Sequence, residues 1–115
     1  MDKLTEMSAG ARKVAELRAK MDITKSWTTA RRQYWKAMAE LYPGDFSPED
    51  LARMKKGLAP RRINPRSGKA ESKELHHKKP QREKGSHDPA NLNEVWPDEH
   101  QQEDIYRRLW KASDK

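Results

Sequence analysis

Two adjacent histidines are the residues of this chain best suited to chemistry. His76 and His77 end the run Glu74-Leu75-His76-His77, Asn91 and His100 follow downstream, and three of the chain's four histidines belong to this pattern. Adjacent side chains on an extended segment point to opposite faces. One imidazole can therefore bind a metal ion while its neighbour faces a substrate as a base. The pattern indicates a metal-assisted hydrolytic site.

The charge of the chain favours an anionic partner. Its 25 basic and 18 acidic residues give a formal net charge of +7. Residues 58–84 carry nine basic and three acidic groups, whereas residues 85–115 carry four basic and seven acidic ones. The basic surplus therefore peaks beside the histidine pair, which predicts a cationic track for phosphates leading to a cation-binding pocket. The alternative is a basic loop that is simply well solvated.

The composition indicates one small, polar domain of 115 residues. Hydrophobic residues make up 33% and charged residues 37%, so the buried core is modest and a bound ion would add stability. The absence of cysteine excludes disulfides and thiolate zinc sites. The sequence contains no signal peptide and no apolar stretch of membrane-spanning length, so we expect no membrane partner.

Apolar spacing predicts two amphipathic helices that must support this site. The first stripe runs over roughly residues 3–21 and the second from Trp27 to Leu41. Ser26 is a plausible N-cap of the second helix, and Pro43-Gly44 ends it. Helical spacing favours a packing role for its aromatic residues over stacking on nucleotides. These aromatic residues are Trp27, Tyr34 and Trp35.

Caps and turn formers predict the remaining elements. Ser47-Pro48 with two following acids starts a helix, and Gly57 ends it. Residues 60–68 mix basic residues with turn formers, which predicts two short extended pieces around a turn, the second running into the histidine pair. We expect a loop over 78–90, a short strand over 91–96 and a last helix that opens at Pro97.

Residues 74–104 resemble the HNH endonuclease motif, or ββα-metal fold, in the His-His form of colicin-type DNases and of toxin domains in bacterial polymorphic effectors. Residues 51–60, with the Tyr34-Trp35 helix before them, are similar to the lead-in of Rhs-associated toxin domains. The residues that carry the HNH resemblance are Glu74-Leu75-His76-His77, Lys78-Lys79-Pro80, Gly85, Asp88, Asn91-Leu92, Val95, Pro97 and His100.

The resemblance implies an α+β fold in which N-terminal helices precede a ββα-metal (HNH) nuclease motif. Residues 1–115 would form a single nuclease domain. Within it, residues 1–57 would be a helical lead-in, and residues 58–115 would hold a basic hairpin and the ββα-metal core.

The resemblance also implies a role for each matched residue. His76 would be a metal ligand, and His77 the general base that activates water. Asn91 would hold the loop between the strands and so orient His77. His100 would be the second metal ligand. In the colicin type the third ligand is a histidine four residues later, where this chain has Asp104.

An aspartate at position 104, in place of the colicin-type histidine, leaves the expected ligand geometry intact. A spacing of four places His100 and Asp104 on one helix face, whereas the competing carboxylate, Glu103, points about 100° away on an ideal helix. The ligand set of His76, His100 and Asp104 implies one divalent ion. The carboxylate of Asp104 shifts the metal preference towards magnesium or manganese, with zinc and nickel still compatible.

Two further side chains near the motif have open roles. Glu74 alternates with His76 along the strand, so it would either orient that ligand through a hydrogen bond or be a strand-edge carboxylate. His87 lies outside the matched pattern. We expect it to be a surface residue or a hydrogen-bonding loop residue, with contact to phosphate as the alternative.

The function implied by the resemblance is a metal-dependent DNase that acts as an antibacterial effector toxin. It would be delivered as one end of a longer effector polypeptide, by a contact-dependent or type VI secretion route, and act in the target-cell cytoplasm. A cognate immunity protein would protect the producer. The alternatives are an RNA-cleaving toxin of the same fold and a non-catalytic nucleic-acid-binding module with a structural metal.

Basic side chains around the motif are expected to follow the DNA backbone, since guanidinium and ammonium groups bind phosphate oxygens. No base-reading motif is present, which predicts little sequence preference. The candidate backbone-binding residues are Arg61, Arg62, Arg66, Lys69, Lys78, Lys79 and Arg82.

Overall fold

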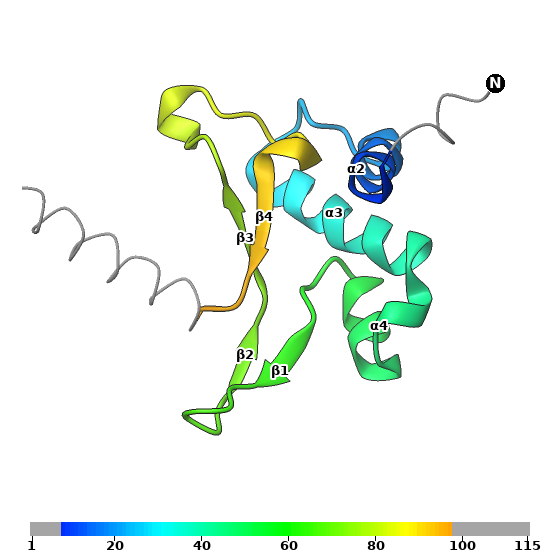
Figure 1. Ribbon diagram of the computed structural model, residues 1–115, viewed down its shortest axis with the longest axis vertical. Helices are drawn as coiled ribbons and strands as arrows, with labels where there is room; N and C mark the ends of the chain where they lie inside the picture. Colours follow the sequence, from blue (N-terminus) through cyan, green and yellow to red (C-terminus); the bar gives the residue numbers. More distant parts are fainter. Residues whose placement is uncertain (1–7, 98–115) are drawn as a thin grey trace, which may run out of the picture.

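The computed structural model describes residues 8–97, in which three α-helices precede two short antiparallel strand pairs (Figure 1). The helices are α2 (Ala9–Lys20), α3 (Trp27–Leu41) and α4 (Pro48–Met54). The strands are β1 (Arg61–Ile63), β2 (Ala70–Ser72), β3 (Glu74–His77) and β4 (Leu92–Val95). Short 3-10 turns occur at Pro43–Asp45, Gln81–Glu83 and Pro89–Asn91. The mixed α+β prediction is confirmed, while the helix expected after Pro97 lies outside the described residues.

A serine caps the start of each described helix. The side chains of Ser8, Ser26 and Ser47 accept hydrogen bonds from the backbone N–H three residues further on, at 3.1, 3.3 and 3.1 Å. The predicted starts at Ser26 and Ser47 are therefore confirmed. The helix expected over 3–21 corresponds to α2, which begins at Ala9 because Ser8 is extended and caps it, and residues 3–7 lie outside the described residues. No helix within residues 8–97 is long and apolar enough to cross a membrane.

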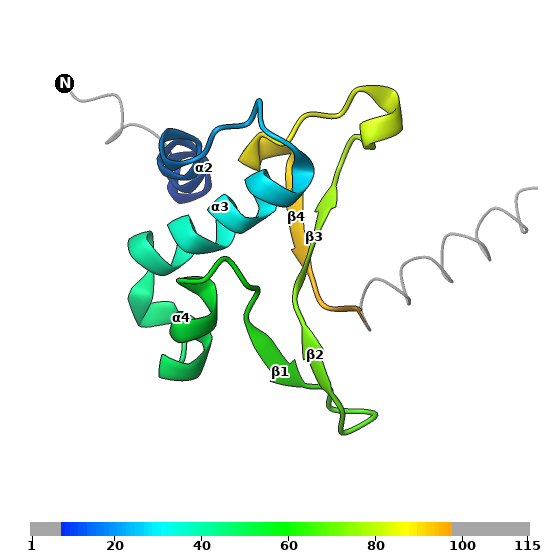
Figure 2. The same ribbon diagram turned by 180° about the vertical axis from the view of Figure 1, so that it is seen from behind.

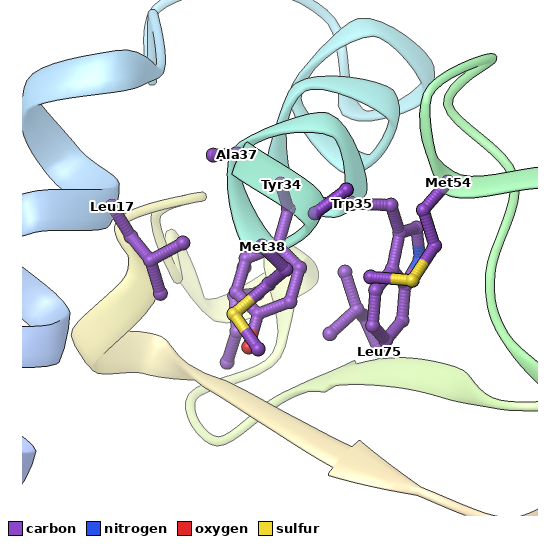
Figure 3. Packing of buried hydrophobic residues seen from close by; sticks show 9 residues of the cluster. Leu17, Tyr34, Trp35, Ala37, Met38, Met54 and Leu75 are labelled. Carbon is purple, nitrogen blue, oxygen red and sulfur yellow. The ribbon is translucent and has the colours of Figure 1, made fainter. Parts of the chain in front are cut away.

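Helix α3 forms the centre of the hydrophobic core (Figure 3). Its side chains Tyr34 and Trp35 are 4% and 1% exposed, so the prediction that they pack in the core is confirmed. Four other elements each bring an apolar side chain to this core, and burial of such a side chain stabilises the fold by about 1.5–3 kcal/mol. They are Leu17 of α2, Met54 of α4, Leu75 of β3 and Leu92 of β4.

The two strand pairs are joined end to end. β1 pairs with β2 in a hairpin, and β3 pairs with β4 around a longer loop. Only Lys73 separates β2 from β3, so the chain runs from one pair directly into the other (Figure 2). Leu75 on β3 and Leu92 on β4 attach the second pair to the core. The fold thereby fixes the strand that carries the histidines against α3.

Candidate active site

Strand β3 gives its two histidines different surroundings. Side chains alternate along a strand, so Leu75 and His77 lie on one face of β3 and Glu74 and His76 on the other. The ring of His77 lies 4.3 Å from the ring of Trp27, the first residue of α3. Nε2 of His76 instead lies 3.2 Å from Oε1 of Glu74. The two histidines therefore lie on opposite faces of the strand, as expected of an extended segment.

His77 belongs to a cluster of three rings. Its Nε2 lies 2.9 Å from Nδ1 of His87, and the His87 ring lies 5.2 Å from the Trp27 ring. Burial, with smaller contributions from His87 and His76, lowers the pKa of His77 below its ordinary value. His87 is therefore a hydrogen-bonding loop residue, one of the two roles expected of it, and its partner is the predicted base.

Asn91 fastens the loop that follows His77. Its Oδ1 accepts a hydrogen bond from the backbone N–H of Lys79 at 2.9 Å. Its Nδ2 donates to the backbone carbonyls of Lys79 and Ser86, at 3.1 and 2.8 Å. The backbone carbonyl of Asn91 accepts from the N–H of Lys78 at 2.8 Å. The amide thus connects the two ends of the loop between β3 and β4.

Two further contacts fix this loop. The N–H of Gly85 donates to the carbonyl of Pro80 at 2.9 Å, and a Cβ on Gly85 would lie 1.7 Å from the carbonyl oxygen of Lys79. Asp88 accepts two hydrogen bonds from Arg18 of α2, at 2.6 and 2.9 Å. The bond from Arg18 is the main reason that the pKa of Asp88 falls below its ordinary value. The loop therefore has little freedom to move the residues around His77.

The donors at His76 fit a divalent metal ion. An imidazole hydrogen-bonded to a carboxylate is a common arrangement for a metal ligand, and both side chains are accessible, at 33% for His76 and 46% for Glu74. Within residues 8–97, no group of three His, Cys, Asp or Glu side chains could hold an ion alone. The other predicted ligands, His100 and Asp104, and the alternative Glu103 lie outside the described residues.

A cationic groove of about 490 Å³ lies beside His76, between α3, the segment after α4 and the β2–β3 connection. Glu74 is the one acidic residue among the described residues that line it. Lys73 pairs with Glu94 at 3.0 Å, but Arg31, Arg32 and Lys56 form no ion pair with any described residue. The basic residues lining the groove are Arg31, Arg32, Arg53, Lys56 and Lys73.

The basic residues predicted to bind the DNA backbone fall into two groups on either side of this groove. The tip of the β1–β2 hairpin and the loop over 78–90 lie at opposite ends of the strand pairs (Figure 1). Arg62 pairs with Glu71 at 2.6 Å and lies 4.5 Å from the ring of Trp96, so part of its charge is neutralised within the protein. The hairpin group is Arg61, Arg62, Arg66 and Lys69, and the loop group is Lys78, Lys79 and Arg82.

Three kinds of site residue were missing from the sequence predictions. The groove cations of α3 and α4 were not predicted, although the tandem Arg31-Arg32 beside a buried helix stripe is a visible signal. Trp27 was expected only to pack or to stack on nucleotides, and it contacts His77. The bond from His77 to His87 had no signal beyond the presence of a histidine in the loop.

The three helices, the histidine pair on β3 and the loop held by Asn91 have the arrangement expected of a nuclease of the His-His type. The family model for the colicin/pyocin-S2 DNase domain matches residues 6–108. Among solved structures, the chain is similar to the pyocin AP41 DNase–immunity complex, with a TM-score of 0.59 and 28% identity over 79% of this chain and 69% of that one. No curated protein sequence matches. The chain belongs to the colicin/pyocin DNase family.

Membership of this family makes the chain a metal-dependent, DNA-hydrolysing endonuclease domain of the toxin type. The sequence predictions of an enzyme, of a DNA substrate and of a toxin role are therefore confirmed.

Proposed function

We propose that His77 is the general base in hydrolysis of DNA phosphodiester bonds by this domain. The observation that carries this assignment is the placement of the His77 ring. Trp27 and His87 hold it on the face of β3 opposite to His76, and its Nδ1 hydrogen-bonds to none of the described residues. An imidazole fixed in this way has one nitrogen open to take a proton from water.

We assign His76, His100 and Asp104 as ligands of one divalent ion, which would be magnesium, manganese, zinc or nickel. His76 supports this assignment because it lies at the edge of the cationic groove with Glu74 beside it. Glu74 would keep the imidazole oriented through its hydrogen bond. When bound, the ion would polarise the phosphate and stabilise the leaving oxygen.

The groove is the proposed site for the DNA backbone. Arg31, Arg32 and Lys56 present positive charge there without a carboxylate partner among the described residues. Guanidinium groups can bind two phosphate oxygens at once. Phosphate contacts carry no sequence information, so this mode of binding supports cleavage with little sequence preference. The predicted cations of the hairpin and the loop would extend the contact on either side.

The biological role that we propose is that of an antibacterial effector toxin, delivered at one end of a longer polypeptide and active in the target-cell cytoplasm. A contact-dependent or type VI secretion route of the Rhs kind would carry it. A cognate immunity protein would neutralise it, which is supported by the likeness to a pyocin DNase solved with its immunity protein. The net charge of +7 would suit an acidic partner.

A plasmid-nicking assay tests the assignment of the base. The purified domain should nick supercoiled DNA with a divalent metal and stop when a chelator is added. His77→Ala should lower the rate constant about 10²–10⁴-fold while DNA and metal affinity stay unchanged, because general-base catalysis contributes about that factor. His76→Ala should instead lose the metal in a calorimetric titration.

Lys36→Gln is the matched control, because this exposed side chain lies on α3 outside the residues that line the groove. It should cleave at the wild-type rate. Full activity of the His77→Ala protein would overturn the assignment of the base. Preferential cleavage of structured RNA in a parallel reaction would contradict the DNA substrate.

A further inference from the structure

We propose that Arg62 is a positioning residue for the proposed metal site and not a contact to DNA. Its guanidinium packs on the ring of Trp96, with 4.5 Å between Cζ and the ring centroid. Trp96 and Pro97 lead into the segment that contains the proposed ligands His100 and Asp104. The contact would thereby hold the end of β4 from which this segment continues. The inference rests on the proposed function, in which these two residues bind the ion.

Side chains hold Trp96 where the strand pairing ends. The last pair of β3 and β4 joins Glu74 to Val95, so Trp96 lies one residue beyond it. Lys73, the single residue between β2 and β3, lies at the same level (Figure 2). Its Nζ is 5.3 Å from the centre of the Trp96 ring, and Arg62 reaches that ring from β1. Both cations lie within the roughly 6 Å at which an aromatic ring attracts a positive charge.

Arg62 is itself held by the hairpin. Its Nε donates to Oε1 of Glu71, the cross-strand neighbour on β2, at 2.6 Å. Nδ2 of Asn64 donates to the other oxygen of this carboxylate at 3.1 Å. Asn64 is buried, and its Oδ1 accepts from the backbone N–H groups of Arg66 and Ser67 in the turn. The guanidinium that packs on the indole is therefore fixed by contacts that reach the hairpin turn.

These contacts distinguish Arg62 from a cation that is open to a phosphate. Its side chain is 27% exposed and that of Glu71 13%, and a phosphate would compete with this carboxylate for the guanidinium. Lys69 on the same hairpin is exposed and forms no ion pair with any described residue. Arg62 thereby leaves the set of hairpin residues proposed to bind the DNA backbone, whereas Lys69 stays in it.

Titration of the metal-free protein with Zn²⁺ in a calorimeter measures positioning without DNA or catalysis. Arg62→Gln should lower the Zn²⁺ affinity about 10-fold, the lower end of the usual cost of losing an outer contact around a metal ligand. Trp96→Leu should lower it at least as much. The double variant should be no weaker than Trp96→Leu alone, because Arg62 acts through that ring. Trp96→Phe keeps a ring and should retain most of the affinity, and Lys36→Gln should match the wild type.

A purely structural role for Arg62 makes different predictions. If Arg62 only stabilised the hairpin, Arg62→Gln would lower the unfolding temperature of the metal-free protein. Its Zn²⁺ affinity, measured where the protein is folded, would then equal that of the wild type. That result would overturn the inference. Losses that multiply in the double variant would overturn it as well, because the two side chains would then act independently.

Fluorescence anisotropy with duplex DNA in chelator tests whether Arg62 contacts DNA. Arg62→Gln and Lys69→Gln each remove one positive charge from the hairpin. The salt slope of binding should keep its wild-type value in Arg62→Gln and fall by about 1 in Lys69→Gln. A slope reduced by about 1 in Arg62→Gln would mean that this side chain binds a phosphate, and the inference would be wrong.

His100→Ala tests the proposed function separately in the same Zn²⁺ titration. It should lose the ion, and an unchanged affinity would contradict the proposed ligand set. Loss of Zn²⁺ binding in His100→Ala together with wild-type affinity in Arg62→Gln would contradict only the positioning role of Arg62. The two failures are therefore distinguishable.

Discussion

Neighbouring histidines on β3 acquire different chemistry from their surroundings. His76 is beside a carboxylate, Glu74, at the edge of an open groove. His77 is half-buried between an indole and a third imidazole. A carboxylate stabilises an imidazole as a metal ligand, whereas burial favours the neutral imidazole that can accept a proton. Strand alternation, by giving the two histidines these different surroundings, would therefore separate the proposed ligand from the proposed base one residue away.

Glu94 is a largely buried carboxylate outside the active site. It accepts a hydrogen bond from the hydroxyl of Tyr34, lies 3.0 Å from Nζ of Lys73 and 3.8 Å from Nζ of Lys13. Burial alone would raise the pKa of Glu94. The hydrogen bonds from Tyr34 and Lys73, with the charges of Lys73 and Lys13, outweigh burial and hold the pKa below its ordinary value of 4.5. Glu94 thereby joins α2, α3 and β4.

The Glu94 network should make the fold sensitive to acid. The pKa of Glu94 is lower in the folded protein than in the unfolded chain. The contribution of ionised Glu94 to stability is therefore complete above pH 4.5 and is lost as pH falls through the folded pKa. Glu94→Gln should lower the free energy of unfolding by about 1–3 kcal/mol at neutral pH. Urea unfolding from neutral pH down to about pH 3 should show this difference shrinking as Glu94 becomes protonated in the wild type.

Glu40→Gln is the control for this measurement. Glu40 is 67% exposed and pairs with Lys20 on the surface, so its loss should change stability by less than about 1 kcal/mol. A Glu94→Gln deficit that stays constant across the whole pH range would contradict a charged Glu94 in the folded protein.

The loop between β3 and β4 is the element that brings the remaining site residues to His77. Gly85 allows its tight path, since an added Cβ would meet the carbonyl of Lys79. Gly85→Ala should therefore force the loop apart and destabilise the protein by more than about 1 kcal/mol. The nicking rate should fall as well, because the same loop holds Asn91 and His87. Thermal unfolding and plasmid nicking measure the two effects.

Gly44→Ala provides the comparison for Gly85→Ala, because nothing lies within 4 Å of a Cβ at Gly44. This variant should unfold and cleave like the wild type. A Gly85→Ala protein that also behaves like the wild type would show that the loop accommodates a side chain, and the steric argument would be wrong.

Local signals made most of the described elements predictable from sequence. Ser26 and Ser47 mark helix starts because a cap depends on residues within one turn. The hairpin and β3 follow from turn formers and alternation for the same reason. The contact of Trp27 with His77 joins residues far apart in sequence and depends on how α3 packs on β3, so no local pattern reveals it. The roles of His100 and Asp104 stay predictions.

At the scale of the whole molecule, the position of the positive charge matters more than its sum. The net charge of +7 attracts DNA from any direction. The groove concentrates arginines and lysines from α3, α4 and the β2–β3 connection next to His76. The hairpin tip carries further cations at one end of the strand pairs (Figure 2). A DNA backbone seated in the groove would place a phosphate at His76, the proposed metal ligand, whereas a backbone on the tip alone would not.

Two double variants that remove equal charge distinguish these positions. Arg31→Gln with Arg32→Gln acts in the groove, and Arg66→Gln with Lys69→Gln acts at the hairpin tip. Glutamine keeps the Cβ and Cγ of Arg32, which pack on Gly57, so the fold should survive. Removing one cation that binds a phosphate should reduce the salt slope of DNA binding by about 1, and removing the groove pair should therefore reduce it by about 2.

Fluorescence anisotropy with duplex DNA in chelator measures this slope without cleavage, and nicking assays with metal report the rate. The groove variant should weaken both affinity and cleavage, because in the proposed binding mode Arg31 and Arg32 would hold the scissile bond near His76 through the phosphates. The tip pair should have a smaller effect on each. Both variants lower the net charge of +7 by the same amount, so equal effects would mean that overall charge, and not the groove, brings DNA to the site.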